Sequence, residues 1–159
     1  TGEVMGIDSD FGRAFAKSQL GSGTSLPIEG NVFISVRDSD KLAMVEVGRK
    51  LKKMGFSLVA TEGTAAVLNS AGLETKFIKK VYEGRPHIVD YMISGEIQLV
   101  LNTTEGAKAI EDSFELRRSA LLRKIPYYTT VAGARAAIEA ISAIRSGGLE
   151  VEPIQSYFN

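Results

Sequence analysis

The chain has 159 residues, of which 44% are hydrophobic and 24% charged, a composition typical of one globular domain and not of a disordered chain. Its 19 basic and 19 acidic residues balance, so no overall field favours nucleic acid or an anionic membrane, and any anion site must be local. Cysteine is absent and His87 is the single histidine, which excludes disulfides, thiolate metal sites and cysteine nucleophiles, and we expect no metal site.

The first 30 residues combine a short amphipathic helix with a linker. Apolar spacing at Phe11, Ala14 and Phe15 predicts a helix over residues 11–20, and the Gly/Ser-rich residues 21–25 break its periodicity. The opening residues carry no basic signal region, and no apolar run approaches a membrane span in length. We therefore expect a cytoplasmic protein. Because the chain starts without methionine, we also expect it to be a segment of a longer protein, with a second unit beginning at residue 31.

From residue 31 onward, β-branched runs alternate with amphipathic helical patterns. The nearly continuous apolar run at residues 31–36 is typical of a strand buried on both faces. A helix begins at about Lys41, with Asp38 or Ser39 as the N-cap and Gly55 as the stop. The same alternation predicts strands over residues 31–36, 56–60, 75–78, 97–101 and 125–128, and helices over residues 41–53, 65–71, 87–94, 114–124 and 131–144.

This alternation predicts an α/β fold. Crossovers of this length give parallel strand pairing, and right-handed crossovers place helices on both faces of the sheet. We therefore expect a doubly wound, Rossmann-like, five-stranded parallel sheet flanked by helices. Because ligands of such sheets bind beyond the carboxyl ends of the strands, the loops after the five predicted strands are the candidate site.

The turn after the second predicted strand has the features of a phosphate-binding loop. Gly63 lies between Thr61 and Thr64 at a helix start, where free backbone N–H groups and the helix dipole favour an anion. Read alone, the turn slightly favours an ordinary N-cap at Thr61 or Thr64. The loops after the first and third strands add basic residues, namely Arg37, Lys41, Lys79 and Lys80. Their expected convergence at one sheet edge favours anion binding, with Lys41 and Thr64 on exposed loop ends.

The turn after the fourth predicted strand suits recognition better than catalysis. Asn102 and Thr104 can donate and accept hydrogen bonds but scarcely titrate, although Asn102 could equally bond its own backbone. Pro86 is expected at or near the first turn of helix 87–94, with His87 just inside it. The sequence has no nucleophile elbow, no full Walker loop and no histidine–acid pair in a recognisable order, so we expect no catalytic residue.

Several short strings occur in a fixed order along nearly the whole chain: residues 1–6, 15–21, 35–37, 60–65, 83–88, 102–104, 110–113 and 117–121. In these strings the chain resembles the C-terminal allosteric domain of bacterial carbamoyl phosphate synthetase large subunits, which has the methylglyoxal-synthase-like fold. The resemblance implies that residues 1–30 are the tail of the preceding ATP-grasp domain plus a linker, and that residues 31–159 are the allosteric domain.

The parent enzyme implied by the resemblance joins bicarbonate, glutamine-derived ammonia and two ATP molecules into carbamoyl phosphate for pyrimidine and arginine synthesis. The parent uses ATP with Mg or Mn and potassium, whereas this segment is expected to hold no cofactor and to catalyse nothing. Implied partners are the rest of the large chain, the glutaminase small subunit and, through self-association, other large chains.

The resemblance also implies ligands. Bacterial members bind UMP as inhibitor and IMP as activator in one pocket, with ornithine at the border with the preceding domain. The residues implied are Lys41, Thr61, Thr64 and Lys80 for the phosphate, Asn102 and Thr104 for the ribose or base, and Ser35 and Ser113 for the wall. On the ornithine side the matching positions are Tyr128, through its backbone, and Thr129. Tyr128 stands where the family pattern carries aspartate.

Two other readings come from different classes of protein. Methylglyoxal synthases share the implied fold and act on dihydroxyacetone phosphate through an aspartate base in a Gly-Gly-Asp-Gln-Gln stretch. The equivalent stretch here, residues 83–87, carries Arg85 in place of that base, which argues against catalysis. A structural oligomerisation module is the third reading and is compatible with a regulatory one.

Overall fold

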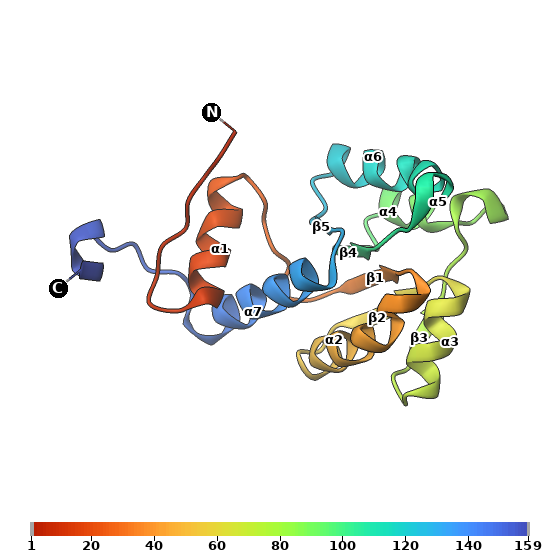
Figure 1. The fold of residues 1–159 in the computed structure, drawn as a ribbon, viewed down its shortest axis with the longest axis horizontal. Coiled ribbons are helices and arrows are strands. Elements are labelled where there is room, and N and C mark those ends of the chain that lie inside the picture. Colours follow the sequence, from red (N-terminus) through yellow and green to blue (C-terminus); the bar gives the residue numbers. More distant parts are fainter. Residues whose placement is uncertain (1, 159) are drawn as a thin grey trace.

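The computed structural model describes residues 2–158 (Figure 1). Residues 1 and 159, the outer ends of the two predicted units, lie outside this range. The strands are β1 (Asn31–Ser35), β2 (Ser57–Ala60), β3 (Thr75–Phe77), β4 (Leu99–Asn102) and β5 (Tyr127–Tyr128). The α-helices are α1 (Phe11–Gly21), α2 (Lys41–Lys53), α3 (Glu62–Ser70), α4 (Ile88–Ile93), α5 (Gly106–Asp112), α6 (Phe114–Leu122) and α7 (Val131–Gly147). Short 3₁₀ turns cover Asp38–Asp40, Val81–Glu83 and Ile154–Phe158.

The strands form one five-stranded parallel sheet in the order β3-β2-β1-β4-β5. The chain runs outward from the central β1 to β3 and then returns to add β4 on the other side of β1, where Ser35 pairs with Asn102. Consecutive crossovers therefore diverge between β1 and β4, and this divergence opens a crevice at the carboxyl edge of the sheet. The predicted doubly wound α/β fold is confirmed.

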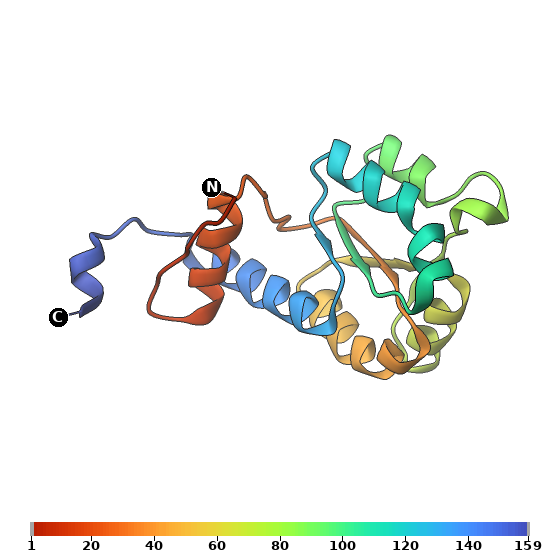
Figure 2. The ribbon, with the colours of Figure 1, turned by 45° about the horizontal axis from the view of Figure 1, so that its top comes forward.

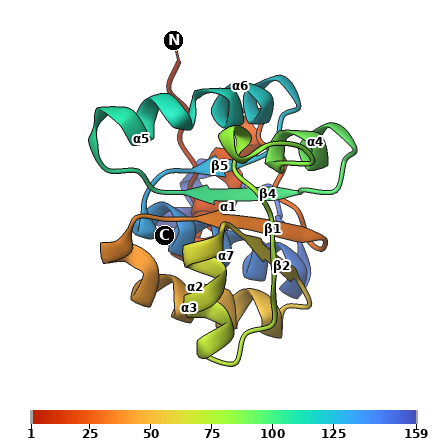
Figure 3. The same ribbon diagram turned by 90° about the vertical axis from the view of Figure 1, so that its right-hand side faces the viewer.

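Helices cover both faces of the sheet, as Figures 1 and 3 show. Along β1 the side chains of Val32 and Ile34 enter one core, which also contains residues of α2, α3 and α7. Phe33 points to the other face and packs with residues of α4 and α6. This alternation explains why the sequence of β1 is apolar at successive positions, because each residue meets a layer of helices.

Helix α1 lies beside α7, away from the carboxyl edge of the sheet (Figure 2). Ala16 on α1 is fully buried, and a Cβ added to Gly12 would come within 2.9 Å of the Glu139 carbonyl oxygen of α7. The two helices therefore approach too closely for any side chain larger than hydrogen at Gly12.

Several predicted boundaries are wrong. Helix α5 was not expected, because its sequence has almost no apolar periodicity and Ile110 on it is 49% exposed. Helix α3 begins at Glu62, three residues before the predicted start, so Thr64 lies within its first turn.

The helix starts also differ around residues 38 and 87. Asp38 and Ser39 form a 3₁₀ turn that leads into α2, so neither of them caps that helix. Pro86 follows a cis peptide bond and lies outside α4, whose N-cap is His87. Pro86 therefore lies near the first turn, as predicted, whereas the prediction that His87 lies just inside the helix is wrong.

Candidate functional site

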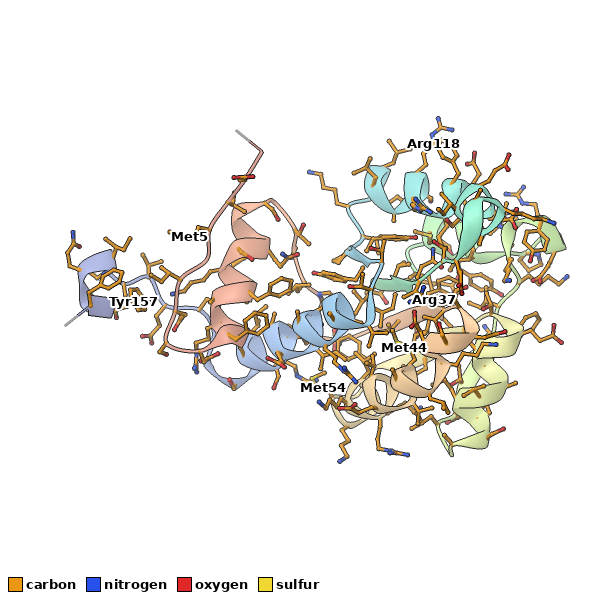
Figure 4. The ribbon with its side chains drawn as sticks, viewed as in Figure 1. Met5, Arg37, Met44, Met54, Arg118 and Tyr157 are labelled. Atoms are coloured by element: carbon orange, nitrogen blue, oxygen red, sulfur yellow. The ribbon has the colours of Figure 1, made fainter. Side chains whose placement is uncertain are left out.

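A cleft of about 440 Å³ lies at the carboxyl edge of the sheet, lined by the segments that follow β1, β2, β3 and β4. Figure 4 shows Arg37, one of its lining residues, at the end of β1. The structure brings together the eight residues that the sequence assigns to an effector pocket: Ser35, Lys41, Thr61, Thr64, Lys80, Asn102, Thr104 and Ser113. Lys79 lies outside the cleft lining, and its backbone forms an isolated parallel β-bridge with His87.

One end of the cleft is formed by the start of α3. Thr61 is the N-cap residue, but its side chain makes no capping bond and its hydroxyl donates instead to Ser35 Oγ at 3.2 Å. Thr64 is only 2% exposed, and its Oγ1 accepts the backbone N–H of Val36 at 3.3 Å. Both hydroxyls therefore tie α3 to β1, and the Thr61 side chain leaves the first-turn N–H groups free to meet an anion.

A lysine ammonium stands over this helix start. A Cβ added to Gly63 would come within 2.7 Å of Lys41 Nζ, so the ammonium lies directly against this glycine and a larger residue would push it aside. Lys41 Nζ also pairs with Asp38 Oδ1 at 2.6 Å, and this hydrogen bond lowers the pKa of the Asp38 carboxyl. A cation at the positive end of a helix is unfavourable, and an anion placed between the two would reverse that interaction.

The segment after β3 supplies a second cation and an aromatic ring. Lys80 Nζ lies 5.6 Å from the centroid of the Tyr82 ring, and both residues line the cleft. The ring of Tyr82 is 61% exposed at the cleft mouth. Lys80 is therefore held beside the cleft by a cation–π contact, without a neutralising carboxylate in the salt bridges of residues 2–158.

The other end of the cleft is a buried polar network. Asn102 is 4% exposed, and its Nδ2 donates to the hydroxyl of Tyr127 on β5. Ser113 Oγ donates to the Ile110 carbonyl at 2.9 Å and accepts from the guanidinium of Arg117. Desolvation by burial raises the pKa of the Tyr127 hydroxyl.

Sequence reasoning missed three participants in this site. Thr103 is 6% exposed, and its Oγ1 accepts the backbone N–H of Arg37 at 3.2 Å. Tyr127 and Arg117 contact Asn102 and Ser113 from β5 and α6, elements whose sequences show only a short aromatic strand and an amphipathic helix. No local pattern in the sequence points from either residue to the cleft.

The cleft lining also includes an apolar surface. It is formed by Phe33, Val81, Ile88 and Leu116. Phe33, Ile88 and Leu116 belong to the core between the sheet and helices α4 and α6. The cleft thus offers cations and helix N–H groups at one end, an apolar floor, and an amide at the other end.

Tyr128 and Thr129 do not line the cleft. The Tyr128 hydroxyl donates to Gln19 Oε1 of α1 at 2.8 Å, and its ring centroid lies 6.4 Å from that of Phe15. Desolvation by burial raises the pKa of Tyr128 to about 12. Thr129 is exposed. The structure therefore separates these two residues from the eight cleft residues.

The region around Arg85 and His87 forms its own cluster outside the cleft lining. The Arg85 guanidinium binds the Asp90 carboxylate, which also accepts the His87 backbone N–H at 2.9 Å. These two bonds lower the pKa of Asp90. Among residues 2–158, no group of three or more histidines or acids is placed to hold a metal ion. No helix in the same range is both long and apolar enough to cross a membrane.

Residues 43–129 match the model of the MGS-like domain family. The chain belongs to this family. The MGS-like chain is 54% identical over 158 residues to the carbamoyl phosphate synthase large chain of Rhizobium meliloti (strain 1021), a match that covers 99% of this chain and 14% of that protein. The C-terminal section of the Methanopyrus kandleri large chain is 50% identical over 152 residues, covering 95% of this chain and 28% of that section. The resemblance noted in the sequence is thus confirmed.

Solved structures share the fold of this MGS-like chain. Methylglyoxal synthase from Elizabethkingia anophelis NUHP1 superposes with a TM-score of 0.60 and 17% identity, covering 84% of this chain and 93% of the synthase. ForH superposes with a TM-score of 0.52 and 16% identity, covering 76% of this chain and 82% of ForH. At these identities the likeness shows the fold alone.

Proposed function

We propose that this chain is the regulatory segment of a cytoplasmic carbamoyl phosphate synthase large chain and that its cleft binds nucleoside monophosphate effectors of the UMP and IMP type. One observation carries this proposal. Lys41 stands over the uncapped start of α3, and Thr61, Thr64 and Lys80 line the same cleft, which also contains a buried amide. The chain spans 14% of the length of the large chain it matches. That the whole protein is a carbamoyl phosphate synthase, an ATP-dependent ligase, is therefore part of the same proposal.

The α3 end suits a phosphate dianion. Lys41 and Lys80 supply two ammonium groups, and Gly63 lets an anion approach the backbone N–H groups of the first turn. The anion would also relieve the unfavourable placement of the Lys41 ammonium at the helix N-terminus. Such contacts are individually worth about 1.5–3 kcal/mol when one partner is charged.

The rest of the cleft suits a nucleoside. Its volume of about 440 Å³ falls in the usual range for small-molecule sites. The apolar floor of Phe33, Ile88 and Leu116 can pack against a planar base, while Asn102, Thr104 and Ser113 provide polar groups for the ribose or base edge. Titratable groups play no part in these contacts, which fits binding without chemistry.

The remaining functions implied by the family concern the parent protein. The whole enzyme, and not this segment, would use ATP with Mg or Mn and potassium. It would also bind the glutaminase small subunit and make the contacts between large chains. Tyr128 and Thr129 would form one side of an ornithine site at the border with a preceding domain. The two amino groups of ornithine need carboxylate partners, and at this position the chain supplies only Thr129 and the Tyr128 backbone carbonyl, so we expect ornithine to bind this chain feebly.

Methylglyoxal synthesis is the second candidate, because the phosphate end of the cleft would also accept dihydroxyacetone phosphate. That reaction needs a base beside the substrate carbon. Arg85 occupies the position of that base, and it lies outside the cleft lining and is paired with Asp90. We therefore expect no methylglyoxal to form.

Calorimetric titration of the chain with UMP, IMP, ornithine and dihydroxyacetone phosphate tests the proposal. We expect one molecule of UMP or IMP to bind per chain, and saturating IMP to weaken the apparent affinity for UMP. Failure of both nucleotides to bind would contradict the effector role. An unaltered UMP affinity in saturating IMP would contradict the single pocket, and methylglyoxal formation above the non-enzymic rate would favour the second candidate.

A further inference from the structure

The side-chain amide of Asn102 is held in one orientation by Tyr127. Asn102 Nδ2 donates to the Tyr127 hydroxyl. The amide nitrogen therefore points toward β5 and away from the rest of the cleft.

The amide oxygen of Asn102 is left for the cleft. It accepts no hydrogen bond from residues 2–158. Among those residues, His87 Nδ1 is the side-chain N or O atom that is both fully buried and without a hydrogen-bond partner. The Asn102 oxygen also has no partner, so it is not fully buried and solvent reaches it. Because Asn102 is 4% exposed and lines the cleft, that access runs through the cleft.

The position of Asn102 relative to α3 fits the far edge of a nucleotide base. Thr61 follows β2, Asn102 ends β4, and β1 lies between these two strands. Neighbouring strands lie about 4.8 Å apart, so the phosphate end and Asn102 are separated by roughly 10 Å. A nucleoside monophosphate has a comparable span from its phosphate to the far edge of its base.

We propose that Asn102, oriented by Tyr127, presents its amide oxygen as an acceptor that selects bases carrying a ring N–H donor over bases carrying a ring nitrogen acceptor. Uracil and hypoxanthine carry such a donor, whereas cytosine and adenine present a lone pair at the corresponding ring nitrogen. Tyr127 is a positioning residue in this proposal, and Asn102 is the residue that contacts the base. The proposal rests on the proposed nucleotide function and assigns its base specificity.

The expected discrimination is large enough to measure. With cytosine or adenine in place, two acceptors face each other and a buried group loses its partner, which costs about 1–3 kcal/mol. UMP should therefore bind roughly five- to a hundredfold more tightly than CMP, and IMP should exceed AMP by a similar factor.

The experiment compares UMP, CMP, IMP, AMP and ribose 5-phosphate by calorimetry on the wild-type chain and on Tyr127→Phe. Ribose 5-phosphate has no base, so its affinity reports on the contacts to the phosphate and the ribose alone. Tyr127→Phe keeps the ring and removes the hydroxyl that fixes the amide. In this variant the UMP:CMP ratio should fall severalfold, while the affinity for ribose 5-phosphate stays unchanged.

Tyr128→Phe is the matched control, because the neighbouring hydroxyl bonds Gln19 and not Asn102. It should retain the wild-type UMP:CMP ratio. Proton NMR of bound UMP gives a second readout that needs no variant, since the N3–H proton should be protected from exchange with water.

The outcomes separate this inference from the function it rests on. If UMP and CMP bind equally well, or CMP binds more tightly, the acceptor role of Asn102 is wrong while the nucleotide site stands. An exposed, rapidly exchanging N3–H proton in bound UMP also contradicts the inference. If neither the nucleotides nor ribose 5-phosphate bind, the proposed function fails as well.

Discussion

Two places on the carboxyl edge of one sheet differ in what fills them. At the ends of β1, β2 and β4 the residues are Ser35, Thr61 and Asn102, and the space above them is the cleft. At the end of β5 stands Tyr128, whose ring packs beside Phe15 and whose hydroxyl binds Gln19. The topology places every strand end at the same edge, but the size of the end residue and its neighbours decides where a cavity forms.

The two places also differ in energetic role. Around Tyr128, burial of an aromatic ring stabilises the contact between α1 and the sheet. In the cleft, the buried hydroxyls of Thr61, Thr64 and Thr103 bond neighbouring strand ends and contribute little apolar burial. A polar cleft of this kind stabilises the fold less than a packed aromatic would, which is consistent with its use for binding.

Removing the cations is the most severe test of the cleft. Lys41→Ala combined with Lys80→Ala deletes two charge-assisted contacts of about 1.5–3 kcal/mol each, so UMP affinity should fall roughly 10²- to 10⁴-fold. Calorimetry measures this loss. Stability should change little, because the partner of Lys41, Asp38, is 95% exposed.

The matched control replaces Lys50 and Lys53, which lie on α2 outside the cleft lining, with alanine. That pair should leave UMP affinity within about threefold of the wild type, well under 1 kcal/mol. Comparable losses in both double variants would show that net charge, and not the cleft, governs binding.

Thr64→Val tests whether the cleft hydroxyls support the fold. The sequence suggested an exposed loop end, but Thr64 is buried and accepts the Val36 N–H. Valine has the same shape and leaves that buried N–H without a partner, so the free energy of unfolding should fall by about 1–3 kcal/mol. Urea unfolding measures the change. Thr64→Ser keeps the hydroxyl and should lose less; equal stability of the valine variant and the wild type would refute the structural role.

Tyr128→Phe tests the packed end of β5, where Tyr128 contacts α1. Loss of the hydrogen bond to Gln19 should lower the free energy of unfolding by about 0.5–1.5 kcal/mol, since the ring and its contact with Phe15 remain. UMP affinity should stay the same, because Tyr128 lies outside the cleft lining. A changed affinity would mean that the two places are coupled.

Alkaline pH tests the burial of the same Tyr128 hydroxyl. The pKa of Tyr128 is raised to about 12 in the folded chain, against about 10 for an unperturbed tyrosine. The folded state therefore holds this proton more tightly, and the stabilisation is fully present below pH of about 10 and lost as pH rises toward 12. Urea unfolding across this interval should show the wild type losing more stability than Tyr128→Phe. Parallel pH curves for the two proteins would contradict this.

The sequence by itself determined the order and type of the main elements. Apolar runs at β1, β2 and β4 are strong because both faces of these strands are buried, and glycines mark the ends of several helices. From that alternation the parallel sheet, and the gathering of strand-end residues such as Thr61 and Asn102, follow by general rules of chain crossover. Local pattern sufficed wherever burial imposed a period on the sequence.

Only the tertiary structure decided the contacts made at long range. Tyr127 orients Asn102, Thr64 bonds Val36, and Gln19 of α1 meets Tyr128, across separations of 25, 28 and 109 residues. Helix α5 likewise lacks the apolar stripe from which a helix is predicted in a sequence. A hydrogen bond between distant residues leaves no periodicity in either segment, because it depends on where the packed helices and strands bring single side chains together.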